Sequence, residues 1–350
     1  MNEIIIGEKK ISKKNSPYII VEVGINHNGE IEKAYKMIEI AKDAGADCVK
    51  FQTFKAEEFI GDPNQMYTYQ SQGKEITESM LEMFKRYEFR NEEWFQIKKK
   101  CDDAGITFLS TPQNSSDLDL LLKVGISAIK VGSDDFNNLP LLEKYTRTKL
   151  PILLSCGMAD AEEVNQAMRA VRFKDGYPIV LLVCTSLYPT QMKDVNMLRL
   201  KTLSETFPGL VLGFSDHTQG SIAAILAVGL GAVVFEKHFT LDNNLPGPDH
   251  WFSENPNSLK QWIGSIRTAN TMMGSSKVQP TLQEINMRDI ARRSVVVIQD
   301  IKVGDVISLE NCALRRPGTG ISPAQFVDVL GRKAIKDIKS NTLLRWEDLN

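Results

Sequence analysis

The chain has 350 residues, of which 42% are hydrophobic and 25% are charged, and its formal net charge is -2 at pH 7. These fractions are typical of a globular protein, and the length predicts one large domain with a smaller one. The nearly balanced charge argues against a general nucleic-acid binder and against binding to an anionic membrane, although it allows a local basic pocket.

The first ten residues, MNEIIIGEKK, place an acidic residue beside a short apolar run, which is not the pattern of a signal peptide. The longest apolar stretch, residues 222–235, is too short to span a bilayer and contains two glycines, so we expect a buried helix followed by a strand. The five cysteines show no CxxC spacing, and three of them lie in or beside apolar runs. We therefore expect a cytoplasmic protein with reduced, buried thiols.

A repeated pattern runs through most of the chain: a helix, a small residue, a glycine, an apolar strand and then polar residues. It appears as AKDAGADCVKFQT, CDDAGITFLSTP, LLKVGISAIKVGS and AVGLGAVVFEKHFT. Further strands are expected at residues 17–24, 151–157, 179–186 and 210–217, which gives eight candidates, most of them separated by amphipathic helices. Eight such units in roughly 260 residues predict a (β/α)8 TIM barrel. A doubly wound open sheet is the alternative, but no GxGxxG motif follows the first strand.

Two stretches depart from this repeat. Segment 61–89, after the second strand, is too long for an ordinary βα loop and predicts a lid or wall over the carboxyl end of the barrel. After Gly274 the sequence becomes polar, and we expect a linker at residues 276–289. The barrel would then occupy residues 1–275, and a small β-rich domain would occupy residues 290–350.

Polar side chains follow every strand candidate at its carboxyl end. They are Glu22 and Asn26, Lys50 and Gln52, Ser110 and Thr111, Lys130 and Ser133, Ser155, Thr185 and Tyr188, Ser215 and His217, and Glu236 and His238. A single lysine or serine at such a place is more often a surface or turn residue. Eight strands that all end in this way are harder to explain by solvation, and in TIM barrels this edge carries the active site.

The residue types indicate the chemistry of that edge. Lys50 and Lys130, with several hydroxyl groups, suit a phosphate or a carboxylate. His217 and His238 end neighbouring strands beside a carboxylate and suit a divalent metal, although two hydrogen-bonded structural histidines explain those segments equally well. Glu22, at the end of a buried strand, is the best acid–base candidate. The residues alone predict a metal-assisted enzyme that acts on a small phosphorylated anion.

A series of short motifs follows the same edge along the chain. They are EVGINHNG (22–29), KFQ (50–52), LSTP (109–112), KVGS (130–133), LSCGM (154–158), CTSLYP (184–189), SDHT (215–218), EKHFT (236–240) and PGPD (246–249). In identity and order they resemble the sialic acid synthase family. The segment RRPGTGIS (315–322) resembles the antifreeze-like (SAF) domain of those enzymes.

The resemblance implies an activity and an assembly. The enzyme would condense phosphoenolpyruvate (PEP) with an open-chain N-acetylated hexose, giving a nine-carbon 2-keto acid and phosphate. The chain would form a homodimer in which the SAF domain of one chain covers the barrel of the other.

The resemblance also implies roles for single residues. His217 and His238 would bind the divalent metal, Mn2+ or Mg2+. PEP would be held by Lys50, Thr111, Lys130, Ser133, Ser155 and Ser215, and the sugar would be contacted by Gln52, Tyr188 and Asp249. Glu22 would lie near the reacting carbons, with Lys50 and Lys130 as further catalytic groups, and Arg316 would reach across from the partner chain.

Several positions depart from the pattern expected of the family, and they are Gln113, Asp134-Asp135, Ser186 and His250-Trp251. We include Asp135 and Ser186 among the substrate-binding candidates. Because the departures lie nearer to the sugar than to PEP, the acceptor stays open among N-acetylmannosamine, a 6-deoxy diacetamido hexose and another hexose.

Two other functions are compatible with the same fold. One is a binding protein or inactive paralogue that holds an anionic sugar, but the metal-ligand histidines, both lysines and Glu22 are all present. The other is an aldolase that uses Lys50 or Lys130 as a Schiff base, and such a mechanism has no use for two metal-binding histidines.

Overall fold

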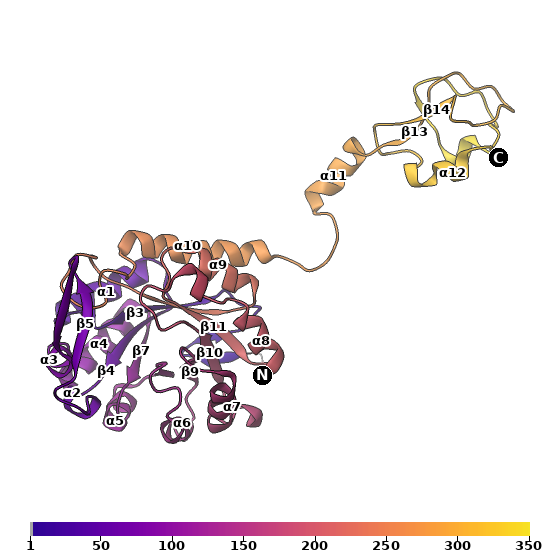
Figure 1. Ribbon diagram of the computed structural model, residues 1–350. Helices are drawn as coiled ribbons and strands as arrows, with labels where there is room; N and C mark the ends of the chain where they lie inside the picture. The colour runs from indigo at the N-terminus through magenta and orange to yellow at the C-terminus, as the bar shows by residue number, and fades with distance from the viewer. Residues whose placement is uncertain (1–2) are drawn as a thin grey trace. The chain divides into compact units, whose positions relative to one another are not determined.

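Eight parallel strands form the core of the larger of two units in the computed structural model, which describes residues 3–350 (Figure 1). They are β3 (Tyr18–Gly24), β4 (Cys48–Thr53), β7 (Thr107–Pro112), β8 (Ile129–Val131), β9 (Ile152–Ser155), β10 (Ile179–Val183), β11 (Val211–Asp216) and β12 (Val234–His238). Hydrogen bonds join them in the order β7-β4-β3-β12-β11-β10-β9-β8, and β7 also contacts β8, which closes the barrel. The predicted (β/α)8 barrel is confirmed.

Helices surround this barrel, and Figure 1 shows them on its outer side. They are α1 (Ile31–Asp43), α4 (Asn91–Ala104), α5 (Ser115–Val124), α6 (Leu139–Thr146), α7 (Ala161–Ala170), α8 (Arg199–Thr206), α9 (Ile222–Gly229) and α10 (Pro256–Met273). Helix α5 illustrates why these segments are helical: Leu118 and Leu121 share its buried face, and Gly125 ends it at a φ of 94°, which favours glycine.

The side chains of each strand alternate between two buried layers, because successive residues of a strand point to opposite faces. The layer that packs against the helices includes Ile19, Val21, Val49, Phe51, Leu154, Leu181 and Phe235. The layer inside the barrel includes Tyr18, Ile20, Cys48, Leu109, Leu153, Val180, Leu182 and Val234. A short hairpin of β1 (Ile4–Ile6) and β2 (Lys9–Ile11) adds three isoleucines to the inner layer.

Segment 61–89 forms an excursion from the barrel. It contains the antiparallel strands β5 (Met66–Ser71) and β6 (Lys74–Ser79), followed by the short helix α3 (Met80–Lys85), and the four-residue helix α2 (Ala56–Phe59) precedes it. The turn between the strands, Gln72-Gly73, has a positive φ at both residues, which suits a two-residue hairpin turn. Residues of this hairpin line a pocket, so the predicted wall is present.

The second unit begins at Ser275 and has its own core. Helix α11 (Leu282–Ala291) covers most of the stretch expected to be a linker, and Thr281 caps it together with Glu284. The antiparallel strands β13 (Ser294–Val297), β14 (Cys312–Arg315) and β15 (Thr342–Leu343) follow in the order β14-β13-β15, with the short helix α12 (Phe326–Val329).

The five cysteines are buried and form no disulfide, as predicted. Among residues 3–350, no helix is both long enough and apolar enough to cross a membrane.

Candidate active site

The polar edge of the barrel is the top layer of the same alternation that builds its interior. On β3 the inward residues Tyr18 and Ile20 are followed by Glu22, and on β4 Cys48 is followed by Lys50. The other strands place Thr111, Lys130, Ser155, Ser215, Glu236 and His238 at matching positions. Seven of the eight strands therefore change from apolar to polar inward side chains near their carboxyl ends, and this polar layer forms the floor of the cavity.

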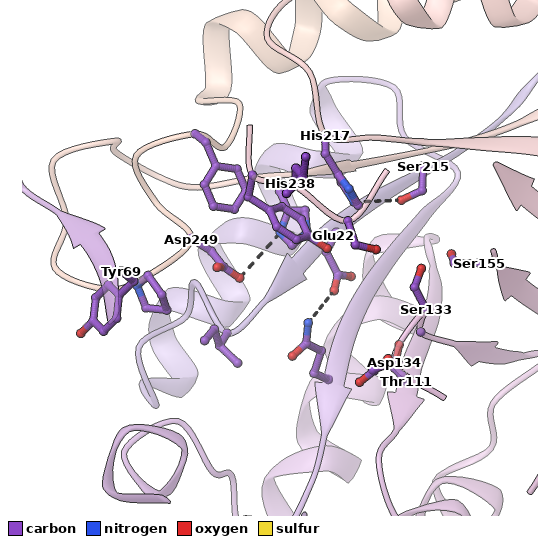
Figure 2. A pocket seen from close by; sticks show the side chains of 18 of the residues that line it. Glu22, Tyr69, Thr111, Ser133, Asp134, Ser155, Ser215, His217, His238 and Asp249 are labelled. Carbon is purple, nitrogen blue, oxygen red and sulfur yellow. Dashed lines mark hydrogen bonds and ion pairs between the residues drawn. The ribbon is translucent and has the colours of Figure 1, made fainter. Parts of the chain in front are cut away.

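That cavity has a volume of about 940 Å³ and gathers most of the predicted site residues. Its wall includes Glu22, Lys50, Gln52, Thr111, Lys130, Ser133, Ser155, Ser186, Tyr188, Ser215, His217, His238 and Asp249. Figure 2 shows many of these side chains converging on one space. A pocket of this size, with convergent polar groups in an apolar frame, is typical of small-molecule sites.

Four charged groups lie at the floor of the cavity, and all four are almost fully buried. Lys50 Nζ lies 2.7 Å from Glu22 Oε2 and 3.8 Å from Glu236 Oε2, and Lys130 Nζ lies 3.7 Å from Glu236 Oε1. Two ammonium groups thus alternate with two carboxylates. Such a cluster balances its own charge before a substrate enters, and it presents two cations to an anionic ligand.

The two carboxylates have very different pKa values. Burial raises the pKa of Glu22 to about 7, against the opposing effect of Lys50. Burial would also raise the pKa of Glu236, but Lys130 and Lys50 outweigh it and lower that pKa to about 2. Two neighbouring carboxyl groups with separated pKa values can take different parts in proton transfer. Glu22 is the one suited to exchanging a proton near neutral pH.

Hydroxyl groups surround the lysines on one side of the cavity. Lys130 Nζ donates to Ser155 Oγ at 2.8 Å, and Lys50 Nζ donates to Thr111 Oγ1 at 3.3 Å. The Gly157 amide donates to Ser133 Oγ at 3.0 Å. A Cβ at Gly157 would lie 2.6 Å from Ser133 Oγ, so only glycine lets the backbone approach this closely. The lysine ammonium groups, the hydroxyl groups and the closely approaching backbone at Gly157 together suit a phosphate or a carboxylate.

The two histidines lie above Glu236, with ring centroids 5.7 Å apart. His217 Nδ1 lies 2.8 Å from the carbonyl oxygen of Thr185 and must carry the proton to donate to it, which leaves the lone pair on Nε2. Ser215 gives its hydroxyl proton to Glu236 Oε1 at 2.9 Å, so it does not also donate to His217. His238 Nδ1 is buried without a hydrogen-bond partner.

These two imidazoles fit a divalent metal. Burial lowers the pKa of His217 to about 4 and lowers the pKa of His238 as well, so both rings are neutral, as metal ligands must be. Within residues 3–350, no group of three His, Cys, Asp or Glu side chains is placed to hold a metal. The chain would therefore supply two ring nitrogens, and water or substrate oxygens would complete the coordination.

The remaining predicted residues are distributed as follows. Gln52 Nε2 donates to Glu22 Oε1 at 3.3 Å, Asp249 Oδ2 lies 3.9 Å from His238 Nδ1, and the ring of Tyr188 lies 4.2 Å from that of His217. Asp135 accepts a hydrogen bond from Asn138 and does not line the cavity, whereas Asp134 does. Arg316 belongs to the second unit, where it is exposed.

The structure adds residues that the sequence reasoning missed. Cys184 lines the cavity 3.2 Å from Ser133, and its position two residues after the inward Leu182 was a usable signal. Tyr67 and Tyr69 enter the wall from the hairpin, and no periodicity in the sequence pointed to them.

A second ionic cluster lies behind the histidines, on the opposite face of the same strands. Lys237 Nζ lies 3.0 Å from Asp216 Oδ2 and 3.5 Å from Glu254 Oε1. Asp216 also accepts hydrogen bonds from Thr218 and from Trp262 Nε1, the latter at 2.9 Å. Because Asp216 precedes His217 and Lys237 precedes His238, this cluster joins the two segments that carry the imidazoles.

Comparison with known proteins gives consistent matches. The family model described as NeuB family matches residues 37–278, and the SAF domain model matches residues 292–350. The chain is 38% identical to N,N'-diacetyllegionaminic acid synthase of Legionella pneumophila over 352 residues, covering 99% of each chain. It is 33% identical to pseudaminic acid synthase of Helicobacter pylori, covering 95% of this chain and 98% of that one. The crystal structure of an N-acetylneuraminic acid synthetase from Leptospira borgpetersenii matches with a TM-score of 0.73 and 32% identity, covering 82% of this chain and 96% of that one.

Proposed function

The chain belongs to the NeuB family, and on that premise we propose that it condenses PEP with the open-chain aldehyde of an N-acetylated amino sugar. Its relatives include proteins named N,N'-diacetyllegionaminic acid synthase and pseudaminic acid synthase. The products would be a nine-carbon 2-keto acid, which is a nonulosonic acid, and inorganic phosphate. The observation that carries the proposal is the pair of buried lysines, Lys50 and Lys130, alternating with Glu22 and Glu236 beneath the two histidines.

The cavity would offer a separate place to each reactant. Lys130, Ser133, Ser155 and Thr111 gather on one side and would neutralise the phosphate and carboxylate of PEP. Figure 2 shows Asp249 and His238 on the other side of Glu22 from Ser133 and Ser155, where the sugar aldehyde would lie. This arrangement would hold the two reacting carbons near Glu22, and such positioning lowers the barrier of a bimolecular step.

The bond changes follow from the chemistry of an enol phosphate. Carbon 3 of PEP would attack the aldehyde carbon, and the aldehyde oxygen would take up a proton. Carbon 2 then becomes electron-deficient and adds water. The bond between carbon 2 and the bridging oxygen breaks, and the hydroxyl proton passes to the departing phosphate, which leaves the keto group. Glu22, with its raised pKa, would accept the proton of that water. A divalent metal bound by His217 and His238 would polarise the aldehyde oxygen.

The test is phosphate release from PEP against a panel of N-acetylated hexoses, with and without exhaustive chelation. Release is expected only when an amino-sugar aldehyde and a divalent metal are both present. With PEP carrying heavy oxygen at the bridging position, the label should leave in phosphate. Label kept in the keto acid would show P–O cleavage and overturn the mechanism.

Three further measurements separate the alternatives: activity with pyruvate, trapping with borohydride, and PEP binding. A Schiff-base aldolase would accept pyruvate in place of PEP, and borohydride would trap its substrate on Lys50 or Lys130. An inactive paralogue would bind PEP without releasing phosphate. Full activity with pyruvate, or binding without turnover across the panel, would refute the synthase.

We also propose that two chains assemble, with Arg316 of one chain entering the barrel of the other. The exposed guanidinium of Arg316 supports this proposal. So do Leu282, Ile285 and Ile290, whose apolar side chains are exposed on α11. A helix with apolar side chains in solvent is a common sign of a surface that another chain covers.

A further inference from the structure

The β5–β6 hairpin forms one wall of the cavity. Tyr67, Thr68, Tyr69 and Gln70 of β5 and Glu75 of β6 all line it. Tyr67 and Tyr69 are two residues apart on one strand and therefore point to the same face, and their rings stack with centroids 5.8 Å apart. The hairpin thus presents a pair of aromatic rings as a surface.

Several contacts hold the hairpin in place. Tyr69 Oη donates to Glu78 Oε1 at 2.6 Å, and Arg86 donates to both oxygens of Glu78, at 2.7 and 2.6 Å. Tyr69 also packs on a small apolar cluster of Ile25, Phe54, Met83 and Tyr87. An isolated two-stranded hairpin is only marginally stable, so these contacts fix the position of the ring pair.

The hairpin is also tied to the loop that carries Asp249. Gln72 Nε2 donates to the carbonyl oxygen of Asn244 at 2.9 Å, and the Gly247 amide donates to Ser71 Oγ at 3.1 Å. Burial and, second, the Asp249 carboxylate raise the pKa of Tyr67, which places the phenol within electrostatic range of that carboxylate. Tyr67 and Asp249 therefore belong to the same end of the cavity.

This end lies away from the lysines. Figure 2 shows Tyr69 beyond Asp249, on the opposite side from Ser133 and Ser155. If PEP occupies the serine side and the reacting carbons meet near Glu22, the acceptor must extend from Glu22 toward Asp249 and the hairpin. The ring pair then faces the carbons of the acceptor that are farthest from its aldehyde.

The lining at this end is rich in aromatic rings and thioethers, and it contains no cationic side chain of this chain. It consists of Phe59, Tyr67, Thr68, Tyr69, Gln70, Glu75, Met80, Met83 and Phe84 on the hairpin side, with Asp249 opposite. Aromatic rings and thioethers favour CH and methyl groups, whereas Glu75 and Asp249 would repel a phosphate. Within the barrel's own chain, none of these lining residues is a lysine or arginine that could neutralise one.

We propose that the β5–β6 hairpin selects the acceptor through Tyr67 and Tyr69, accepting an unphosphorylated amino sugar whose distal end carries a methyl group rather than a hydroxymethyl or a phosphate. The inference deepens the proposed synthase function and rests on it. Tyr67 and Tyr69 act as specificity-determining residues that touch the acceptor and not PEP.

The test measures kcat/KM for three acceptors that differ only at carbon 6: N-acetylmannosamine, its 6-deoxy form and its 6-phosphate. In the wild-type enzyme the 6-deoxy form should react best and the 6-phosphate worst. Tyr67→Ala and Tyr69→Ala should each lower kcat/KM for the 6-deoxy form by about 10- to 100-fold. In both variants the ratio of kcat/KM for the 6-deoxy form to kcat/KM for N-acetylmannosamine should fall toward one, and the KM for PEP should stay unchanged. Tyr35→Ala, on α1 outside the cavity, is the matched control and should leave kcat/KM for all three acceptors unchanged.

Each other outcome is decisive. A wild-type preference for the 6-phosphate, or acceptor ratios that survive both substitutions, would overturn the inference while the synthase function stands. An equal loss for all three acceptors with a raised KM for PEP would show a general structural effect and also overturn it. No phosphate release with any acceptor would refute the proposed function itself, and the inference with it. Melting temperatures identify a variant that fails to fold, and binding of the three acceptors to PEP-loaded wild-type enzyme then decides the preference.

Discussion

Glu22 and Glu236 flank the same ammonium group, that of Lys50, at 2.7 and 3.8 Å. The arrangement keeps one carboxylate ionised and leaves the other near its titration point, because Lys130 approaches only Glu236 within ion-pair distance. Because the two buried carboxylates share the lysines unequally, they have different pKa values and can take different roles in proton transfer.

Glu22→Gln tests the role of the group with the raised pKa. The amide fills the same volume and still accepts a hydrogen bond, so the barrel should fold, but it cannot take a proton from water. We expect the kcat for phosphate release to fall by about 100- to 10,000-fold, the usual contribution of a general acid or base. Glu205→Gln, on the exposed face of α8, is the control and should keep wild-type kcat. A fall of less than tenfold would exclude Glu22 as the proton acceptor.

The two imidazoles can be tested without turnover. His217→Ala and His238→Ala should each weaken Mn2+ binding by more than the 10- to 100-fold typical of an outer-shell partner. Electron paramagnetic resonance of free Mn2+ measures this directly. The melting temperature of the metal-free protein should fall only modestly, because His238 Nδ1 has no hydrogen-bond partner to lose and His217 loses one hydrogen bond, to the carbonyl oxygen of Thr185. Histidines with a purely structural role would give the reverse pattern, a lower melting temperature with unchanged Mn2+ affinity.

Lys237 should be critical for stability. Its side chain is 2% exposed, and it compensates Asp216, whose side chain is fully buried. Lys237→Met keeps the volume but leaves buried carboxylates without a cation, which typically costs about 3–5 kcal/mol. Urea unfolding, followed by tryptophan fluorescence, measures the loss. Lys98→Met removes an exposed pair with Asp102 on α4 and should cost about 0.5 kcal/mol or less. Equal effects of the two substitutions would contradict this assignment.

The barrel was predictable from the sequence because four strands carry the signal of a glycine that ends a helix, an apolar run and then polar residues. The other four are apolar runs that also end in polar residues. The position of Glu22, Lys50 and Lys130 at the carboxyl ends of their strands also predicted that they lie at one edge of the barrel, and all three line the cavity there. Asp134 and Asp135 show where such reasoning fails, since both follow β8 in a loop, and only the loop conformation decides which one faces the cavity.

Long-range contacts were beyond prediction from the sequence. The hairpin is positioned by Ser71 and Gln72, whose partners lie 176 and 172 residues away along the chain. Lys237 looked like one more polar residue at a strand end, although it points away from the cavity toward Asp216 and Trp262. Neither arrangement leaves a periodic trace in the sequence.

His27 predicts how stability depends on pH. It is 1% exposed, stacks on Phe89, and accepts a hydrogen bond from the Gly29 amide at Nδ1. Burial, assisted by nearby His250, lowers its pKa from 6.5 to about 3. The unfolded chain therefore binds the proton more readily between these values. The free energy of unfolding should be highest above pH 6.5 and fall on acidification, by up to about 1.4 kcal/mol per pH unit from this residue.

His27→Phe keeps an aromatic ring beside Phe89 and removes the titrating group. The variant should start less stable at pH 7, since the Gly29 amide loses its acceptor, but its stability should fall less steeply between pH 6.5 and 4. Urea unfolding at several pH values gives both slopes. Equal slopes for the wild-type protein and the variant would show that His27 does not contribute to acid sensitivity.

Arg316 can be tested by complementation between two inactive variants, Glu22→Ala and Arg316→Ala, mixed after dissociation and reassociation. If Arg316 acts on the barrel of a second chain, each mixed dimer contains one site with an intact Glu22 and an intact arginine. Random mixing should then restore roughly a quarter of the wild-type sites. Arg315→Ala removes the neighbouring exposed arginine, which bonds Asn341, and should be active by itself. If each chain used its own arginine, every site in the mixture would lack either Glu22 or Arg316. A mixture that stays inactive, with subunit exchange shown by mass spectrometry, would therefore refute the shared site.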